Sequence, residues 1–578
     1  MGRKSKKTKA PKGAAAWATP SDCRRKCCST GPGCSAAPGP DVKVMPMPEV
    51  HIAEAVQPTI HQDGGMTNQN KREIMTLINM LLERCSITFE KGAKEWKDFI
   101  LVYTLLEQVK KKQEGFSMKN PDREKNFDAF MSWLKEEGVD VDAVSIAKFD
   151  QEGHGLKANR LIPENDIFLS VPRKVMMTSE TAANSVLGEL IQEDKILQQM
   201  HNVALALHLL VEKKNPESRW KPYIDILPET YTTPLYFSAV ELQNMRGSPS
   251  MSEMLNQQRN IIRQYAYFYR LFNTSPGLEK DIPIRDFTFE DYRWAVSTVM
   301  TRQNLIPGRN GSKSMLALIP LWDMCNHCNG QITTDFSDEK DTTMSYALKN
   351  FNEGDQVYIF YGPRRNSEFL LHNGFVYPNN VFDKMALKLG VSKNDPLYNL
   401  RAELLTRLSL LPSRIFQLHA GPEPVDSDII CFLRIFQMTE EELRERLTGD
   451  DSSTLTKQLR DYDVYVSKDN ELKAWSFLQT RIMLLQKAYT TTLEEDEELM
   501  KRPNHTDCAR QGLQLLICEK QILAKTLEFI TRFKVAAEAY VEVKTTKKVV
   551  EENSEGPAEE NSEGPAEDTL DDIQVASA

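Results

Sequence analysis

Apolar residues recur at helical spacing in two segments that follow the N-terminal region. The positions are Ile74, Leu77, Ile78 and Leu81 in the first segment, and Trp96, Phe99, Ile100, Tyr103 and Leu106 in the second. Intervals of three and four residues place side chains on one face of an α-helix. The pattern therefore predicts two amphipathic helices within residues 67–140.

The pattern changes near Val141 to short apolar segments separated by Gly and Pro, which is typical of β-strands. We expect strands at residues 144–149, 155–158 and 167–171. A helical stretch of about residues 179–294 interrupts them. One face of that stretch carries Ile261, Ile262, Tyr265, Phe268, Tyr269 and Phe272.

Strands resume after this insert. The residues that alternate with polar neighbours are Met344, Tyr346 and Leu348. A turn at residues 352–355 then leads into an apolar strand that runs to Tyr361. The simplest description is a β-rich domain of residues 141–382 that is split by a helical insert.

Helical spacing returns beyond about Asp383 and continues to about Val541. One face of the first predicted helix carries Leu400, Leu404, Leu405 and Leu408. The pattern predicts a separate helical domain at residues 383–545. The fold class is therefore α+β, with a β-rich domain split by helices and followed by an all-α C-terminal domain.

Both end regions lack such patterns. Residues 1–66 begin with Lys and Arg and continue with excess Ala, Pro, Gly and Ser, and residues 546–578 contain Glu-Glu-Asn-Ser-Glu-Gly-Pro-Ala twice. Such compositions cannot bury a core, so both regions are expected to be disordered. The cluster of Cys23, Cys27, Cys28 and Cys34 fits no standard zinc spacing. A reduced, disordered segment is the favoured interpretation of these cysteines.

The acidic balance of the chain comes from its last residues. Residues 551–578 contain ten acidic residues and no basic one, and the rest contains 72 basic and 72 acidic residues. A neutral body argues against a nucleic-acid partner bound along an extended basic face, so a protein substrate is favoured. The sequence has neither an apolar run long enough for a membrane span nor a signal core. We therefore expect a soluble, monomeric, cytoplasmic protein, and the basic cluster at residues 3–12 is also compatible with nuclear import.

Four short segments carry candidate chemistry. They are Glu152-Gly153-His154-Gly155, Arg302-Gln303-Asn304, Asp323-Met324-Cys325-Asn326-His327, and Tyr361-Gly362 with Arg364 following. Taken singly, each segment is more often a turn, a capped loop or the end of a strand. Their order and spacing taken together favour a functional site.

Two other interpretations of these residues are weaker. Gly153-x-Gly155 lacks the third glycine, the following helix and the distant acidic residue of a dinucleotide-binding turn. Cys325, His327 and Cys328 suggest zinc, but adjacent side chains point in different directions and no fourth ligand is nearby in the sequence. We expect no metal.

The segments resemble those of SET methyltransferases. From about Lys71 to Val541 the chain is similar to the branch that has an inserted helical region and a C-terminal substrate-binding domain like that of the Rubisco large-subunit methyltransferase. Within that branch it resembles the actin-histidine N-methyltransferases. The resemblance rests on Met300–Asn304, Leu318–His327 and Tyr358–Gly362.

The resemblance implies an S-adenosylmethionine site and a set of residue roles. The cofactor site would comprise Arg123, Glu152, Gly153, His154, Arg302, Asp323, Met324, Cys325, Asn326, His327 and Asn373. Tyr361 would be the catalytic tyrosine, and Asn304, Trp322 and Arg364 would contact the substrate. His154 stands where the family has Phe, and Asn373 where it has Ser, so contacts made there through the backbone would be retained.

The resemblance implies methylation of an actin histidine at the ring nitrogen remote from the main chain, which gives tele-methylhistidine (3-methylhistidine). Histidine has an ordinary pKa near 6.5 and is mostly neutral at pH 7, whereas lysine must first lose a proton. A histidine therefore needs orientation more than deprotonation, and the amide of Asn304 is suited to orient one ring nitrogen.

Two alternatives remain open. A protein-lysine methyltransferase of the same architecture, acting on histones or other proteins, would have the same fold and cofactor. A catalytically silent module could instead use the helical domain to bind a partner. The chain lacks the cysteine clusters that flank the SET domain in many histone-lysine enzymes, so the helical domain must supply a wall of the substrate channel.

Overall fold

The computed structural model describes residues 65–540, apart from residues 88–91, 276–281, 283–285, 312 and 450. The predictions made for residues 1–64 and 541–578, including the cysteine cluster and the acidic repeat, lie outside the described residues. No helix in the described residues is both long and apolar enough to cross a membrane.

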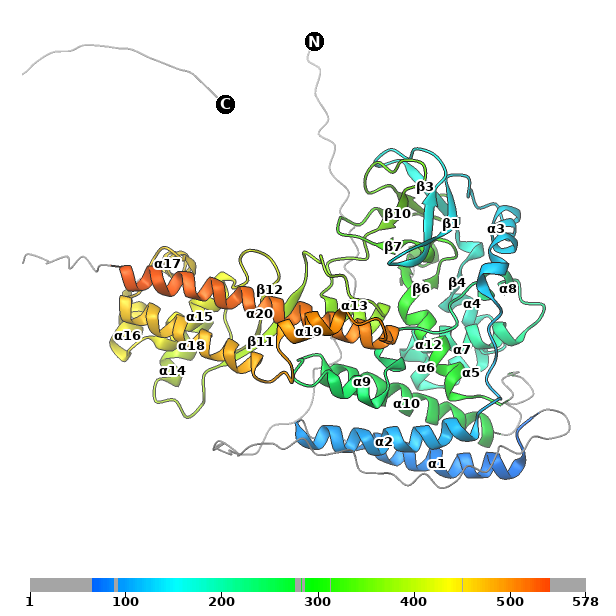
Figure 1. The fold of residues 1–578 in the computed structure, drawn as a ribbon, viewed down its shortest axis with the longest axis horizontal. Coiled ribbons are helices and arrows are strands. Elements are labelled where there is room, and N and C mark those ends of the chain that lie inside the picture. The colour runs from blue at the N-terminus through cyan, green and yellow to red at the C-terminus, as the bar shows by residue number, and fades with distance from the viewer. Residues whose placement is uncertain are drawn as a thin grey trace, which may run out of the picture. The chain divides into compact units, whose positions relative to one another are not determined.

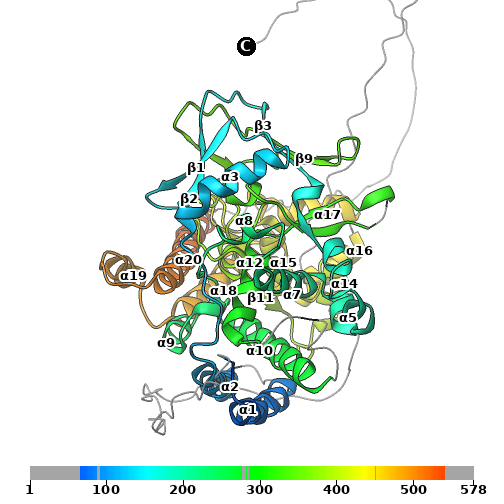
Figure 2. The same cartoon turned by 90° about the vertical axis from the view of Figure 1, so that its right-hand side faces the viewer.

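Two helices open the described chain, as the sequence predicts. Helix α1 (Asn68–Ser86) begins at Thr67, whose side chain accepts from the backbone N–H of Asn70, and helix α2 (Ala93–Lys112) follows. Both pack against the longer helix α10 (Met251–Thr274), and Figure 2 shows the three together. A short 3₁₀ turn η2 (Arg123–Asn126) and helix α3 (Phe127–Glu136) then lead into the first strand.

The β-rich region is built from small sheets. The strands are β1 (Val144–Phe149), β2 (Gly153–Ala158), β3 (Ile167–Pro172), β4 (Met177–Thr178), β5 (Asn304–Ile306), β6 (Met315–Leu318), β7 (Asn326–His327), β8 (Thr334–Ser337), β9 (Thr342–Tyr346) and β10 (Gln356–Ile359). Their orders are β1-β2-β10-β7, β3-β9-β8 and β4-β6-β5. Strand β10 is antiparallel to β2 and parallel to β7. The sheet thus brings residues separated by about 200 positions in the sequence side by side.

The predicted helical insert lies between β4 and β5. Its helices are α4 (Ser179–Ala183), α5 (Gly188–Glu193), α6 (Lys195–Gln199), α7 (His201–Lys214), α8 (Lys221–Ile224), α9 (Ala239–Asn244), α10 and α12 (Phe289–Arg302). The predicted apolar stripe of α10, residues 261–272, is buried. Helix α12 packs against α7 and ends two residues before Asn304. The end of this helix therefore carries Arg302 towards the strands.

The C-terminal region is mainly helical, and Figure 1 shows α18 and α20 side by side within it. Helix α13 (Asn366–Asn373) precedes this region, whose helices are α14 (Tyr398–Arg407), α15 (Ser427–Gln437), α16 (Glu440–Gly449), α17 (Ser452–Arg460), α18 (Lys468–Gln486), α19 (Leu493–Met500) and α20 (Asp507–Ala539). It also contains an antiparallel pair, β11 (Lys384–Gly390) and β12 (Ser413–His419). These two strands were not predicted, so the C-terminal region is predominantly, but not entirely, helical.

A buried carboxyl group connects the helical insert to the C-terminal helices. Glu519 of α20 accepts hydrogen bonds from Ser248 (2.9 Å), Ser250 (3.1 Å) and Tyr489 (2.9 Å). Nearby, the backbone of Gly247 packs so closely against Ala488 that an added Cβ would lie 2.5 Å from its carbonyl oxygen. The insert and the C-terminal helices are therefore closely fitted at this point.

Candidate active site

Tyr361 lies immediately beyond strand β10 and is held at both ends. Its backbone N–H donates to Nδ1 of His327 at 3.2 Å, and its hydroxyl donates to the carbonyl oxygen of Cys325 at 2.5 Å. Both contacts follow from the parallel pairing of β10 with β7, in which Ile359 lies opposite His327. Burial raises the pKa of the Tyr361 hydroxyl above its ordinary value. The phenol therefore stays protonated and acts as a donor.

His327 occupies an aromatic environment. The rings around it belong to Phe360, Tyr361, Phe369, Phe375 and Tyr377. Burial, with a smaller contribution from Arg364, lowers the pKa of His327 to about 4. The ring is therefore neutral, and because Nδ1 accepts from Tyr361, the proton resides on Nε2. No cluster of His, Cys, Asp or Glu in the described residues could hold a metal ion.

A buried charged group lies next to this segment. Nη1 of Arg302 lies 3.3 Å from Oδ2 of Asp323 and donates to the Asp323 carbonyl oxygen at 2.9 Å. The hydroxyl of Tyr223 donates to Oδ2 of Asp323 at 2.5 Å. The Asp323 side chain is 1% exposed and that of Arg302 is 11% exposed. Burial alone would lower the pKa of Arg302, but the Asp323 carboxylate holds it above its ordinary value.

Arg123 adds a second positive charge to this group. Its guanidinium and that of Arg302 both approach the sulfur of Met324, at 3.7 and 3.9 Å. Burial and then the like charge of Arg302 lower the pKa of Arg123 to about 10, so it remains protonated at neutral pH. Two guanidinium groups therefore share one buried carboxylate, that of Asp323. This excess of positive charge fits the carboxylate of an amino acid ligand.

Unsatisfied polar atoms support this fit. Nε of Arg123, Nε of Arg302 and Oδ1 of Asp323 are buried and have no hydrogen-bond partner among the described residues. Buried polar groups are rarely left unpaired, and those that are left so often mark a ligand site. The donors of this group are therefore available to an amino acid carboxylate.

The turn at Glu152, Gly153 and His154 lies against the same segment. Gly153 has a φ of +73°, which favours glycine, and it begins strand β2 rather than a helix. Nδ2 of Asn326 donates to the His154 carbonyl oxygen at 3.3 Å. A Cβ at Gly155 would lie 2.8 Å from that same Nδ2. Gly153 thus permits the positive φ of the turn, and Gly155 permits the close approach of the Asn326 side chain. A strand rather than a helix follows, which excludes the dinucleotide-binding interpretation.

The imidazole of His154 faces Glu124, with 3.2 Å between Nε2 and Oε1. Its ring also contacts the ring of Phe127, with 5.1 Å between centroids. Glu124 and Arg123 are adjacent on η2. The His154 side chain therefore packs against the turn that carries Arg123.

The predicted substrate residues come from separate elements. Asn304 begins β5 and is 7% exposed, and its Oδ1 accepts from the backbone N–H of Leu305 at 2.9 Å. Trp322 Nε1 donates to Thr334 at 3.1 Å. Trp322 follows Leu321, whose backbone φ of +68° changes the direction of the chain after β6.

Arg364 and Asn373 are directly connected. Nη1 of Arg364 donates to Oδ1 of Asn373 at 2.9 Å, and Nδ2 of Asn373 donates to the carbonyl oxygen of Thr301 at 3.3 Å. Thr301 immediately precedes Arg302 at the end of α12. Asn373 therefore links the segment after Tyr361 to the helix that carries the buried arginine.

Comparisons with known proteins match both parts of the chain. Residues 153–362 match the SET domain family, and residues 392–523 match the family described as Rubisco LSMT substrate-binding. An actin-histidine N-methyltransferase of Papio anubis is 46% identical over 467 residues, which cover 80% of this chain and 78% of that protein. The protein of the same name from Danio rerio is 46% identical over 462 residues, which cover 80% and 77%. The chain belongs to the family of SET-domain actin-histidine N-methyltransferases.

Solved structures share the fold of this family member. A structure of Rubisco LSMT bound to AdoMet has a TM-score of 0.56 and 23% identity, over 72% of this chain and 93% of that chain. The SET domain of LSMT bound to lysine and AdoHcy has a TM-score of 0.57 and 23% identity, with the same coverage. Together with the family assignment, this likeness confirms the predicted SET architecture, and the family assignment confirms the enzyme class, a methyltransferase.

Two tyrosines of the site were not predicted from the sequence. Tyr223 binds Asp323, and Tyr231 is partly buried near Arg302 and shares a 2.7 Å hydrogen bond with Thr298. Both belong to the helical insert, where no local motif distinguishes them from core aromatic residues. Their proximity to a buried Arg302–Asp323 pair is visible only in three dimensions.

Proposed function

We propose that this protein transfers a methyl group from S-adenosylmethionine to the tele nitrogen of a histidine in actin. The observation that carries the proposal is that the segment Asp323–His327 contacts both a buried arginine and a protonated tyrosine: Asp323 pairs with Arg302, and the Cys325 carbonyl accepts from Tyr361. Membership of the actin-histidine N-methyltransferase family supports both the donor and the substrate.

The buried charged group is suited to hold the donor. When bound, S-adenosylmethionine supplies a methyl group on a positively charged sulfur. Arg123 and Arg302 would hold its carboxylate, and the chain from Asp323 to His327 together with the turn at residues 152–154 would form the surrounding walls. Asp323 and Tyr223 fix the guanidinium of Arg302, so the positive charge is oriented before the donor arrives.

Tyr361 would act by position rather than as a base. Its hydroxyl is protonated and is bound to the Cys325 carbonyl, which places two oxygen atoms 2.5 Å apart at the end of the strand. Oxygen atoms attract the polarised C–H groups of a sulfonium methyl through weak hydrogen bonds. The fixed phenol would therefore align the methyl group with the attacking atom, and alignment is the main requirement of an in-line displacement.

Asn304 would select histidine. Its Oδ1 already accepts from the Leu305 N–H, which fixes the orientation of the amide, and a carbonyl oxygen has a second lone pair. That lone pair can accept the N–H of a neutral imidazole, which leaves the lone pair of the other ring nitrogen free to attack. A lysine amine offers no ring N–H and requires deprotonation at about 4 to 5 kcal/mol near pH 7.

The proposal is tested with labelled donor, purified actin and a matched pair of peptides that differ only in a His or a Lys at the target position. We expect label on the histidine peptide and on one actin histidine, located by mass spectrometry. Transfer to the lysine peptide instead would favour a protein-lysine methyltransferase. Donor binding by calorimetry without transfer to any substrate would indicate a silent binding module.

We further propose that the protein is cytoplasmic, because its proposed substrate is an intracellular protein. We also propose that it is a monomer. The basic cluster at residues 3–12 supports an additional nuclear fraction. Cell fractionation and light scattering of the purified protein test these points. Confinement to a membrane fraction, or a stable dimer at micromolar concentration, would contradict them.

A further inference from the structure

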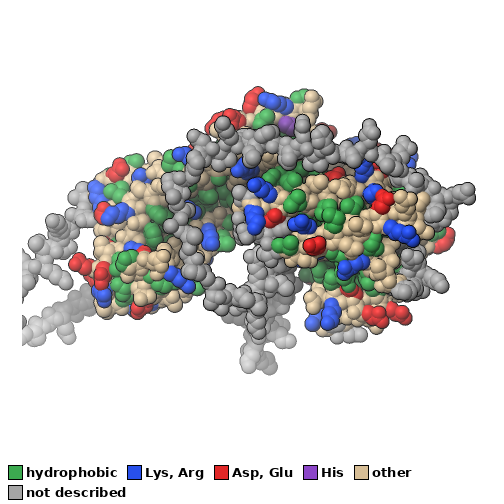
Figure 3. Space-filling view, turned by 90° about the horizontal axis from the view of Figure 1, so that it is seen from below, with side chains coloured by type: hydrophobic (Ala, Val, Ile, Leu, Met, Phe, Trp, Pro, Cys, Tyr) green, Lys and Arg blue, Asp and Glu red, His purple; other side chains and the backbone are tan. Residues whose placement is uncertain are grey.

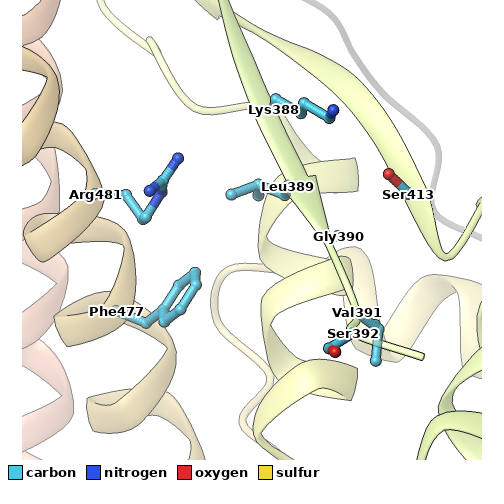
Figure 4. A pocket seen from close by; sticks show the side chains of 8 residues that line it. All are labelled: Lys388, Leu389, Gly390, Val391, Ser392, Ser413, Phe477 and Arg481. Atoms are coloured by element: carbon cyan, nitrogen blue, oxygen red, sulfur yellow. The ribbon is translucent and has the colours of Figure 1, made fainter. Parts of the chain in front are cut away.

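A second recess lies in the C-terminal region, away from Tyr361. It has a volume of about 490 Å³ and follows the end of strand β11 where this strand faces helix α18. Residues 388–392 line it consecutively, so the recess borders the edge of the strand rather than one of its faces. Figure 4 shows Phe477 and Arg481 extending from α18 towards the strand that carries Leu389.

The lining combines apolar surface with positive charge. Phe477 supplies most of the accessible apolar surface, because Leu389 and Val391 are 3% and 7% exposed. Lys388 and Arg481 supply two cationic side chains. Within the described part of the chain, neither Lys388 nor Arg481 forms an ion pair with a carboxylate. Arg414 of β12, in contrast, pairs with Asp428 at 3.1 Å. The recess therefore suits an acidic segment that contains an apolar residue.

The chain itself contains such a segment. Residues 567–573 read Glu-Asp-Thr-Leu-Asp-Asp-Ile, in which Leu570 is flanked by Asp568 and Asp571. The face of the molecule seen in Figure 3 has Lys and Arg interspersed with Asp and Glu. Residues 551–578, in contrast, hold ten acidic residues and no basic one. This charge is complementary to that of Lys388 and Arg481.

The segment can reach the recess. Lys468, at the start of α18, donates to the carbonyl oxygens of Glu538 and Tyr540 at the end of α20. Arg481 lies thirteen residues further along α18, a distance of about 20 Å at 1.5 Å per residue. Thirty residues separate Tyr540 from Leu570, and a linker of that length behaving as a random coil would span about 30 Å on average. Such a linker gives a local concentration in the millimolar range, so weak binding suffices.

We propose that the acidic segment at residues 567–573 docks into the recess between β11 and α18 of its own chain. Leu570 occupies the apolar part beside Phe477, and the flanking carboxylates pair with Lys388 and Arg481. The recess lies within or directly beside residues 392–523, the part matched to a substrate-binding family. The docked segment therefore covers a surface of that domain. The inference does not depend on the proposed methyl transfer.

Zero-length carbodiimide cross-linking of the full chain tests the proposal, because it joins a carboxylate to a lysine amine only when the two are in contact. We expect mass spectrometry to find cross-links from residues 567–572 mainly to Lys388. Exposed lysines elsewhere, such as Lys97 and Lys457, serve as internal references. Salt at about 0.5 M should remove the preference, since the Debye length then falls to a few ångström.

Variants separate docking from chance contact. Arg481→Gln and Leu570→Ser should each lower the Lys388 cross-link about two- to fivefold. Lys487→Gln, which removes a charge from the C-terminal end of the same helix without lining the recess, should leave it unchanged. Cross-links spread evenly over exposed lysines, or insensitivity to Arg481→Gln, would overturn the proposal. So would links formed chiefly between isotopically labelled and unlabelled chains, because these join two copies.

Discussion

The hydroxyl of Tyr361 lies 2.5 Å from the carbonyl oxygen of Cys325, to which it donates. This contact joins the strand that ends in the predicted catalytic residue to the segment predicted to hold the donor. It is possible because β10 and β7 are parallel neighbours and place Tyr358 opposite Asn326. A substitution of either residue is therefore expected to disturb the alignment of the methyl group more than it weakens binding of the donor.

Tyr361→Phe should lower kcat by about 10- to 100-fold and leave the dissociation constant of the donor within about threefold. The lost hydroxyl contact should cost about 1 kcal/mol of folding stability. Single-turnover kinetics, donor calorimetry and thermal unfolding measure the three quantities. Tyr346→Phe, on strand β9, is the matched control and should change none of them. A large loss of donor affinity with unchanged single-turnover rate would contradict this role.

Asn304→Ala should reduce methylation of histidine more than it reduces donor binding. Without the amide, a ring N–H buried in the channel has no acceptor, which costs about 1 to 3 kcal/mol and so about 5- to 150-fold in kcat/KM. The His and Lys peptides, compared side by side, report the selectivity. Asn350→Ala, in the segment between β9 and β10, is the control. Equal losses on both peptides would show that Asn304 does not discriminate.

Arg123→Met separates ligand binding from stability. Arg302 repels Arg123 in the buried group, so the substitution should leave the donor-free protein as stable or make it more stable. The donor should nevertheless bind about 10- to 100-fold more weakly, because a charge-assisted hydrogen bond is lost. Lys125→Met, whose side chain is 82% exposed, is the control. Marked destabilisation with unchanged donor affinity would contradict the assignment.

Donor binding at the turn of residues 152–155 should depend on the backbone of the turn more than on the His154 side chain. Asn326 contacts the carbonyl oxygen of His154, so His154→Phe should keep the donor dissociation constant within about threefold. Gly155→Ala should disrupt the site, because the new Cβ would lie 2.8 Å from the amide nitrogens of Asn326 and Gln356. Calorimetry on both variants checks the contrast, and tight donor binding by Gly155→Ala would refute it.

The buried carboxyl group of Glu519 should make the stability of the protein depend on pH. Burial raises its pKa to about 7, although the hydroxyls of Ser248, Tyr489 and Ser250 favour the ionised form. The folded protein therefore keeps a proton that the unfolded chain loses between about pH 4.5 and pH 7. Stability should fall as the pH rises through this window, by roughly 3 kcal/mol in total.

Glu519→Gln should flatten that slope, because an amide does not titrate. The difference in unfolding free energy between the variant and the parent protein should shift in favour of the variant as the pH rises from 5 to 8. Denaturant unfolding at both pH values measures it. Glu528→Gln, elsewhere on α20, is the control. Parallel pH profiles for Glu519→Gln and the parent protein would contradict a proton bound at Glu519.

The sequence predicts those features that depend on local periodicity. The stripe of α10 agrees with the structure because one face of that helix is buried. The strand at residues 144–149 is also present, as β1, where it pairs with β2, although only Val144 of it is fully buried. The same alternation is present in Met385, Leu387 and Leu389 of β11, but it adjoins strongly helical segments, so the sequence pattern predicts helix there. Its partner β12 lies more than twenty residues further along the chain.

The site was predictable where it consists of contiguous motifs, such as the residues from Asp323 to His327. Contacts that depend on tertiary packing were not. Tyr223 reaches Asp323 from the helical insert, and Glu124 reaches His154 from the turn that carries Arg123. No spacing in the sequence brings these pairs together.

Mapping the product formed on actin tests the central claim most directly. Actin that lacks the modification is incubated with the protein and labelled S-adenosylmethionine, and the modified residue and its ring nitrogen are located by fragmentation and by comparison with methylhistidine standards. We predict a single tele-methylhistidine, whose formation is strongly reduced by Asn304→Ala and by Tyr361→Phe. Methylation found on a lysine, or on the other ring nitrogen, would contradict the account.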